Sequence, residues 1–258
     1  MSSREQEVNP VARCAIDQQF PINEPSTAND DCVPSCWICL EVGPDQSGKE
    51  LVRDCSCRGD SGFAYLGCLV EYVKQTSMDL HVNQLVISDR STDSEVRKFT
   101  VHWQKYSICH QMYQRELALD LVNSLLLFID ENESENNLRN QLRYTNALII
   151  KLDVLCRTTS FSSNSDLALE GKQTAYKLLA MDQQLKIQAV EAFAHEHIGY
   201  FEGLTKDNYK VGIKHYRKAR KIFESRGDTQ SVRNAEVNMS RIKAKHEGTE
   251  PEYWKRTC

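Results

Sequence analysis

The spacing of apolar residues changes character near residue 115. From Arg115 onward, apolar side chains recur every three or four positions, which is the period of an amphipathic helix. Ser165 or Asp166 is expected to cap the third of the predicted helices. Helices of this length joined by short loops favour a helical bundle or a solenoid. The predicted helices are Arg115–Phe128, Leu138–Cys156, Ser165–Leu179, Leu185–Phe201, Tyr209–Ser225 and Thr229–Lys245.

Residues 1–114 show no sustained helical period. Residues 1–31 are polar and contain three prolines, a composition that cannot bury enough apolar surface to fold, so we expect a disordered leader. Short apolar runs then predict a strand at Leu51–Arg53, a helix within Phe63–Val73 and a second strand at Phe99–Trp103. The expected fold class is therefore mainly α. Its parts are a leader (1–31), a small α+β domain (32–114), a helical domain (115–248) and a tail (249–258).

The composition is that of an ordinary globular protein. Of the 258 residues, 40% are apolar and 26% are charged, and the net charge is −4, so the overall balance gives no reason to expect nucleic-acid binding. The chain has neither a charged start followed by an apolar run nor an apolar stretch of about 18 residues. We therefore expect no signal peptide, no membrane association and an intracellular location, either cytoplasmic or nuclear.

The ten cysteines suggest metal binding. Without a secretion signal they are expected to stay reduced, which argues against disulfides. Two closely spaced pairs, Cys36-x2-Cys39 and Cys55-x-Cys57, are followed by Cys68. A tight turn presents two sulfurs to one face of a tetrahedral zinc ion, and a distant pair completes the site. Two such pairs suggest two zinc ions.

Beyond these pairs, the run Cys55-Ser56-Cys57-Arg58-Gly59 and the downstream Trp103 resemble a RING-CH (RING-variant) finger. The resemblance covers residues 36–114. It implies a cross-brace of two zinc ions, in which ligand pairs one and three hold one ion and pairs two and four hold the other. The ligands implied are Cys36, Cys39 and Cys68 for the first ion, and Cys55, Cys57 and Cys109 for the second.

Two ligand positions of that family carry tyrosine in this chain. Tyr65 stands where the family has histidine, and Tyr106 stands where it has the first cysteine of the fourth pair. A phenol with a pKa of about 10 is a poor zinc ligand. Three alternatives are open. Neighbours complete the sites (His110 for the second ion, Cys32 or His81 for the first), water is the fourth ligand, or one or both sites lack zinc and hydrophobic packing keeps the shape.

RING-CH proteins are typically ubiquitin ligases, so the resemblance implies a RING-type ubiquitin-protein transferase. Such proteins hold a ubiquitin-charged conjugating enzyme in a reactive geometry, and no catalytic residue is expected in the chain itself. The family's docking positions correspond to Ile38 and Trp103, which would contact the conjugating enzyme. The alternative is that both side chains only pack the finger.

The segment Ala192–Glu224 is similar to a tetratricopeptide repeat of the kinesin-light-chain type. Gly199 is expected to let two helices approach, with Tyr216 and Ala219 between them. Two or three degenerate repeats are expected, with a plain bundle as the alternative. A competing hypothesis is therefore a non-enzymatic adaptor, in which tetratricopeptide-like helices bind a peptide or protein and the finger is degenerate.

The charge of the helical region is uneven. From Thr205 onward there are 14 Lys and Arg residues against 7 Asp and Glu residues. This excess would suit an acidic peptide, and a solvated helix surface explains it equally well. No aromatic residues alternate with the basic ones in a stacking pattern, so nucleic acid is not an expected partner.

Overall fold

The computed structural model describes residues 34–53, 62–78, 100–106, 109–131, 138–161 and 164–249. The chain divides into two compact units, Met1–Val33 and Pro34–Cys258, and every described residue belongs to the second. The predicted leader and all but the first residue of the predicted tail lie outside the described residues.

The described residues are mainly helical, which confirms the predicted fold class. A two-stranded sheet consists of β1 (Val52–Arg53) and β2 (Phe63–Ala64), which pair antiparallel. No helix in the described part of the chain is long and apolar enough to cross a membrane. The helices are α1 (Leu66–Met78), α3 (Arg115–Glu131), α4 (Leu138–Phe161), α5 (Ser165–Leu185), α6 (Gln188–Gly203), α7 (Tyr209–Ser225) and α8 (Thr229–Glu247).

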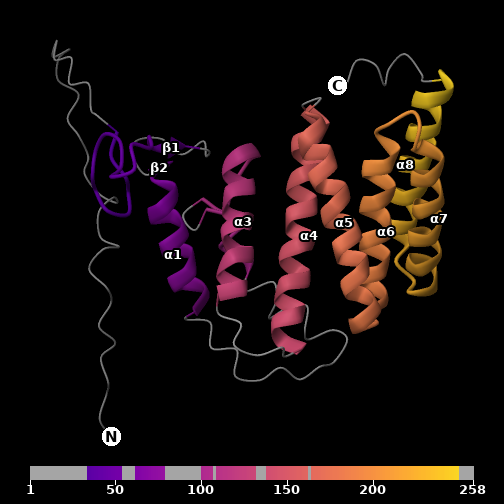
Figure 1. Ribbon diagram of the computed structural model, residues 1–258, viewed down its shortest axis with the longest axis horizontal. Coiled ribbons are helices and arrows are strands. Elements are labelled where there is room, and N and C mark those ends of the chain that lie inside the picture. The colour runs from indigo at the N-terminus through magenta and orange to yellow at the C-terminus, as the bar shows by residue number, and fades with distance from the viewer. Residues whose placement is uncertain are drawn as a thin grey trace, which may run out of the picture. The chain divides into compact units, whose positions relative to one another are not determined.

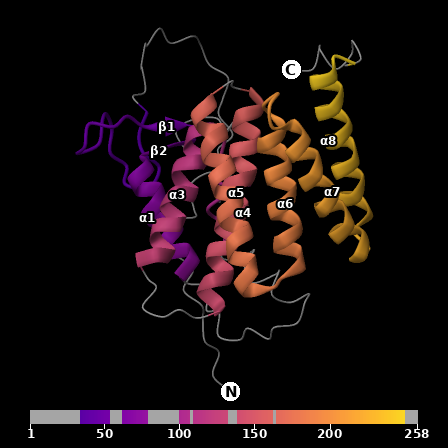
Figure 2. The same ribbon diagram turned by 45° about the vertical axis from the view of Figure 1, so that its right-hand side comes forward.

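Helices α3 to α8 pack in the order of the sequence, each against the next (Figure 1). Further contacts join α4 to α6 and α6 to α8. Figure 2 shows the same succession of helices after a rotation of 45°. Because alternate helices also touch, α4, α6 and α8 form one side of the helical region, an arrangement that stacked helix pairs in solenoids share.

Glycines let α6 and α7 approach each other closely. A Cβ atom on Gly199 would lie 2.6 Å from the Tyr216 ring, and one on Gly212 would lie 2.7 Å from the Gly199 carbonyl oxygen. Both distances are well below van der Waals contact, so only glycine fits at this crossing. Tyr216 and Ala219 are buried, in the positions that the sequence predicts for them.

The predicted strand at Phe99–Trp103 is wrong. Thr100 and Val101 are helical, and the Trp103 N–H donates to the Thr100 carbonyl (3.1 Å). Alternation over three residues does not separate a strand from a single helical turn. Here the turn carries Trp103 into the core, where its side chain is 1% exposed.

Several helix boundaries also differ from the predicted ones. Helix α1 begins at Leu66, after β2 has paired with β1. Helix α6 begins at Gln188 rather than Leu185, because Lys186 adopts a left-handed conformation (φ 53°) that ends α5. Asn164, just before the two predicted residues, caps α5 and accepts hydrogen bonds from two backbone N–H groups.

A core cluster joins the cysteine-rich region to α3. Trp103 stacks on Phe128 of α3, with ring centroids 6.0 Å apart, and donates its indole N–H to Ser77 Oγ of α1 (3.0 Å). Tyr65 and Leu69 are buried in the same cluster. The region that carries the cysteines is therefore held in place by α1 and α3.

Candidate metal centre

A tight turn brings Cys36 and Cys39 together. The Cys36 N–H donates to the Glu41 carbonyl (2.9 Å), and the Leu40 N–H donates to the Cys36 carbonyl (2.7 Å). Leu40 has a positive φ of 66°, which reverses the chain after the second cysteine. The residues that flank the turn form an antiparallel bridge. This is a compact backbone frame for a pair of sulfur ligands.

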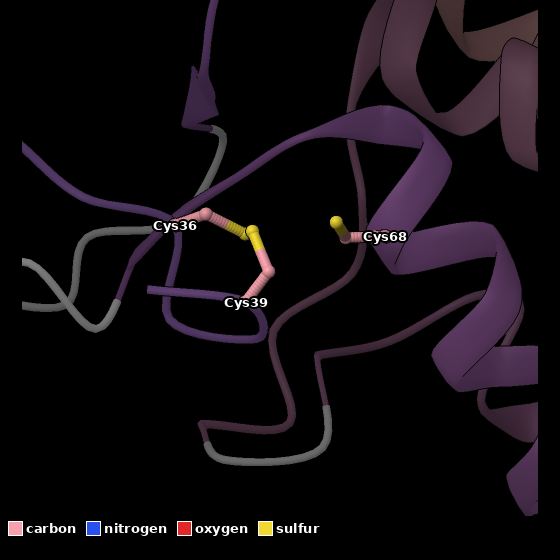
Figure 3. Close-up of side chains that lie close together, drawn as sticks. All are labelled: Cys36, Cys39 and Cys68. Carbon is pink, nitrogen blue, oxygen red and sulfur yellow. The ribbon is translucent and has the colours of Figure 1, made fainter. Parts of the chain in front are cut away.

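Cys68 completes a group of three cysteines. It lies in the first turn of α1, and the turn that carries the other two is tied to β2 by the Trp37 N–H, which donates to a β2 carbonyl (3.0 Å). The Sγ atoms of Cys36, Cys39 and Cys68 all lie within 4.8 Å of one another (Figure 3). Sulfur ligands of tetrahedral zinc lie about 3.8 Å apart for a Zn–S distance of about 2.3 Å. The donor set and its spacing fit zinc.

A cation between the three sulfurs would change the protonation of the cysteines. Burial would raise the pKa of Cys36, but hydrogen bonds from the backbone N–H groups of Cys39, Tyr65 and Ile38 outweigh it, and the pKa lies below its usual value. Burial, together with the neighbouring sulfurs, raises the pKa of Cys68 to about 12. Three thiolates at this spacing repel one another, so a divalent cation between them would favour deprotonation of all three.

Tyr65, at the position where the family has histidine, is engaged elsewhere. Its side chain is 2% exposed, and its hydroxyl donates to the Gly43 carbonyl (2.6 Å). Burial, and next the charge on Cys39, raise the pKa of the phenol, which makes a phenolate ligand still less accessible. Among the described residues, the group that could hold a metal ion contains only the three cysteines.

The described residues of the segment 106–111, which are Tyr106 and residues 109–111, repeat the hydrogen bonds that close the turn Cys36–Glu41. The Tyr106 N–H donates to the Gln111 carbonyl (2.9 Å), and the His110 N–H donates to the Tyr106 carbonyl (2.9 Å). His110 has a positive φ of 56°, and an antiparallel bridge again flanks the turn. Tyr106 and Cys109 have the places in this turn that Cys36 and Cys39 have in the first one.

The second predicted site is therefore only partly described. Cys55 and Cys57 lie outside the described residues, and Cys109 is half-buried. Tyr106 is buried, and its ring centroid lies 4.4 Å from that of Tyr113. Tyr106 thus forms an aromatic pair at the position where the family resemblance implies a cysteine.

Of the residues considered as replacement ligands, His110, the candidate for the second ion, is among the described residues. His110 is exposed and occupies the left-handed position of its turn, and its role as a zinc ligand stays a prediction. Cys32 and His81 lie outside the described residues.

The two predicted docking residues have different environments. Ile38 is half-buried within the first cysteine turn, and next to it Leu40 is 75% exposed and Val42 is 57% exposed. Trp103 is 1% exposed and makes its contacts with α1 and α3. A partner can reach the first group directly, whereas Trp103 has the environment of a core residue.

Sequence reasoning missed two partners that hold this region together, Gly43 for Tyr65 and Ser77 for Trp103. The hydrogen bonds span 22 and 26 residues of the chain. The available signal is general: a buried tyrosine or tryptophan usually finds a partner for its polar atom. That signal predicts a partner without identifying it.

Comparison with known protein families matches residues 36–83 to the RING-variant domain, RINGv. The matched segment contains all three clustered cysteines and Tyr65, and it ends before Trp103 and Cys109. Neither the comparison with curated proteins nor that with solved structures gave a match. Residues 36–83 are therefore similar to a RING-variant domain, a type of domain that implies zinc binding.

Proposed function

We propose that this chain is a zinc-binding protein whose finger docks a ubiquitin-conjugating enzyme, as a RING-type ubiquitin ligase does. The observation that carries the proposal is the group of three cysteines within 4.8 Å of one another inside the RING-variant domain. Because these thiols must stay reduced to bind zinc, the proposal includes an intracellular location, cytoplasmic or nuclear.

The zinc sites have unequal support. The first ion would be held by Cys36, Cys39 and Cys68, whose donor atoms and spacing fit it. A second ion would use Cys55, Cys57 and Cys109, and the repeated turn at Tyr106–Gln111 supports this assignment through its backbone geometry. The proposal is therefore up to two ions, the first bound more firmly than the second.

The docking surface would be the apolar side chains on the first cysteine turn. Ile38 lies between the two cysteines, and the neighbouring Leu40 and Val42 are exposed. An apolar surface next to a rigid metal-bound turn can hold a conjugating enzyme in a fixed orientation. Orientation of the charged enzyme is the whole of the catalytic contribution expected from such a module.

The test combines zinc content with ubiquitin discharge from a charged conjugating enzyme. The I38A variant should lose the acceleration of discharge and keep its zinc. Leu127 of α3 is also a large exposed apolar residue, 61% exposed and outside the finger, so L127A is the matched control and should keep full activity. Equal rates for the wild type, I38A and a reaction without the protein would refute the ligase proposal.

That refuting result would leave the alternative of an adaptor with a degenerate finger. Two observations favour it enough to keep it as a second candidate. The contacts of α4 with α6 and of α6 with α8, together with the glycine crossing of α6 and α7, support a tetratricopeptide-like array. Such an array would bind a peptide or protein on the side formed by α4, α6 and α8.

A further inference from the structure

A pocket lies between α7 and α8, outside the finger. Figure 1 shows these two helices side by side. Its volume is about 470 Å³, which is enough for several side chains of a bound ligand. Its lining residues come from α7 and α8, and no residue of α6 lines it. Its lining residues are Tyr209, Lys210, Ile213, Lys214, Arg217, Met239, Ser240, Lys243 and Glu247.

The pocket has a strong excess of positive charge. Four of its lining residues are Lys or Arg, and the single carboxylate, Glu247, lies 3.9 Å from Lys243. Among the described residues, no carboxylate lies within salt-bridge distance of the other three, Lys210, Lys214 and Arg217. Because these positive side chains repel one another and an opposite charge would stabilise them, the pocket favours an anionic ligand.

The positive field extends along both helices. Between Tyr209 and Glu247 there are 11 Lys and Arg residues and 4 Asp and Glu residues, which leaves 7 unbalanced positive charges, although the whole chain has a net charge of −4. Part of this charge is balanced inside the pair of helices, because Arg220 contacts Glu224 and Glu236. Arg220 does not line the pocket, so the internal ion pairs leave the charge of the pocket itself almost intact.

The apolar part of the pocket narrows the class of ligand. Ile213 and Met239 contribute apolar surface from the two helices, and Tyr209 is stacked on His246, with ring centroids 4.9 Å apart. A bare phosphate ion would leave the apolar groups unused. Nucleic acid would need free aromatic faces for base stacking, and Tyr209 is the one aromatic residue in the lining and already has a stacking partner.

We propose that the α7–α8 pocket binds an acidic peptide segment of a partner protein, with carboxylates on Lys210, Lys214 and Arg217 and an apolar side chain between Ile213 and Met239. This binding site goes beyond the zinc and conjugating-enzyme roles of the finger and does not depend on them. A peptide bound here would lie against α8, the last of the described helices. Ala235 is the only residue of α8 that is buried.

The experiment measures binding of a fluorescently labelled peptide, rich in Glu and containing Leu, to the full chain by anisotropy. The wild type should bind it, with affinity that falls as salt is added. Replacing Lys214 or Arg217 by Glu should raise the dissociation constant by about tenfold or more. Both side chains are exposed, so circular dichroism should show unchanged helicity.

The matched control is K245E. Lys245 is exposed on α8 and does not line the pocket, so this variant has the same change of charge without the contact. It should bind the peptide as the wild type does. If K245E weakens binding as much as K214E, the binding is a diffuse charge effect and the pocket proposal is overturned.

Two further results would also overturn the proposal. One is the absence of binding to the folded wild-type chain, whatever the outcome of the ubiquitin discharge assay. The other is equal competition by a single-stranded oligonucleotide of the same charge, because that would show a general polyanion site. A peptide in which Leu is replaced by Ser should bind more weakly, since the apolar part of the pocket would then be unused.

Discussion

Acid should destabilise the contact between α6 and α7 through two histidines. His195 Nδ1 and His215 Nδ1 lie 3.0 Å apart, and His195 is 5% exposed. At this distance one nitrogen must donate and the other accept, so the two cannot both hold a proton there. Burial, and next the charge of His215 and of Lys218, lower the pKa of His195 to about 4. Burial, and next Lys218, also lower the pKa of His215.

The carboxylates around the two histidines do not cancel the lowering of their pKa values. Glu191 Oε1 lies 3.9 Å from His195 Nε2, beyond hydrogen-bond distance. Glu202 acts to raise the pKa of His215, yet the pKa remains lowered. The Glu202 carboxylate already pairs with Lys172 (2.9 Å) and accepts a hydrogen bond from the Tyr176 hydroxyl (3.0 Å). The Tyr176 ring also packs edge-on against His215.

The sign and size of the effect follow from linkage. An unfolded histidine takes up a proton near pH 6.5, whereas folded His195 resists protonation until about pH 4. The contribution of His195 to the free energy of unfolding is therefore present above about pH 6.5 and is lost as the pH falls towards 4. Between pH 7 and pH 5 the loss from His195 alone is about 2 kcal/mol in the free energy of unfolding. His215 adds to it in the same direction.

The assay is urea unfolding at pH 7, 6 and 5, followed by far-UV circular dichroism, for the wild type and the double variant H195Q/H215Q. Other groups titrate in both proteins, so the difference between the two curves isolates the histidine pair. The wild type should lose about 2 kcal/mol more than the variant over this range. Parallel curves would refute the reasoning, because they would show that the pair protonates as easily in the folded chain as in the unfolded one.

Three other changes test the packing and the ligand alignment. G212A should lower the free energy of unfolding by about 1–2 kcal/mol in urea, since the clash at the α6–α7 crossing exceeds the gain in helix propensity; a gain in stability would contradict the crossing geometry. W103F should cost about 1–3 kcal/mol in the same assay, because Ser77 loses its buried indole donor; no change would show that this hydrogen bond contributes nothing. Y65H should bind zinc more tightly than wild type in chelator competition, with Y65F as the control for the lost Gly43 hydrogen bond; equal or weaker binding would show that Tyr65 is not at a ligand position.

The sequence predictions were accurate where the residues give a clear local signal of the structure. Helix α7 runs from Tyr209 to Ser225 as predicted, because its apolar period is strong and Gly227, with a φ of 73°, follows its end. The junction of α5 and α6 was placed incorrectly. There Lys186 adopts the left-handed conformation, and the Ile187 N–H donates to the Asp182 side chain (2.9 Å). Neither residue type signals a left-handed junction as glycine would.

The cysteine trio was predictable for a similar reason. The spacing Cys36-x2-Cys39 determines a local turn, and the family resemblance added Cys68. The burial of Trp103 was not predictable from spacing. It depends on Phe128 and Ser77, which lie on two different helices. Contacts between distant elements are set by the packing of the whole core, and a short window of sequence contains little information about them.

Tyr65 and Tyr106, which the family resemblance places at ligand positions, contribute to the core of the cysteine-rich region. A zinc finger usually depends on its metal for folding, because its own core is too small. Here Tyr65 and Tyr106 are both buried, and both belong to the core cluster that also contains residues of α1 and α3. Both side chains thus contribute apolar burial to a core that is shared with the helical region. The hydrogen bonds that close the Cys36–Glu41 turn recur between Tyr106, His110 and Gln111, so a buried tyrosine at the first position is compatible with these hydrogen bonds.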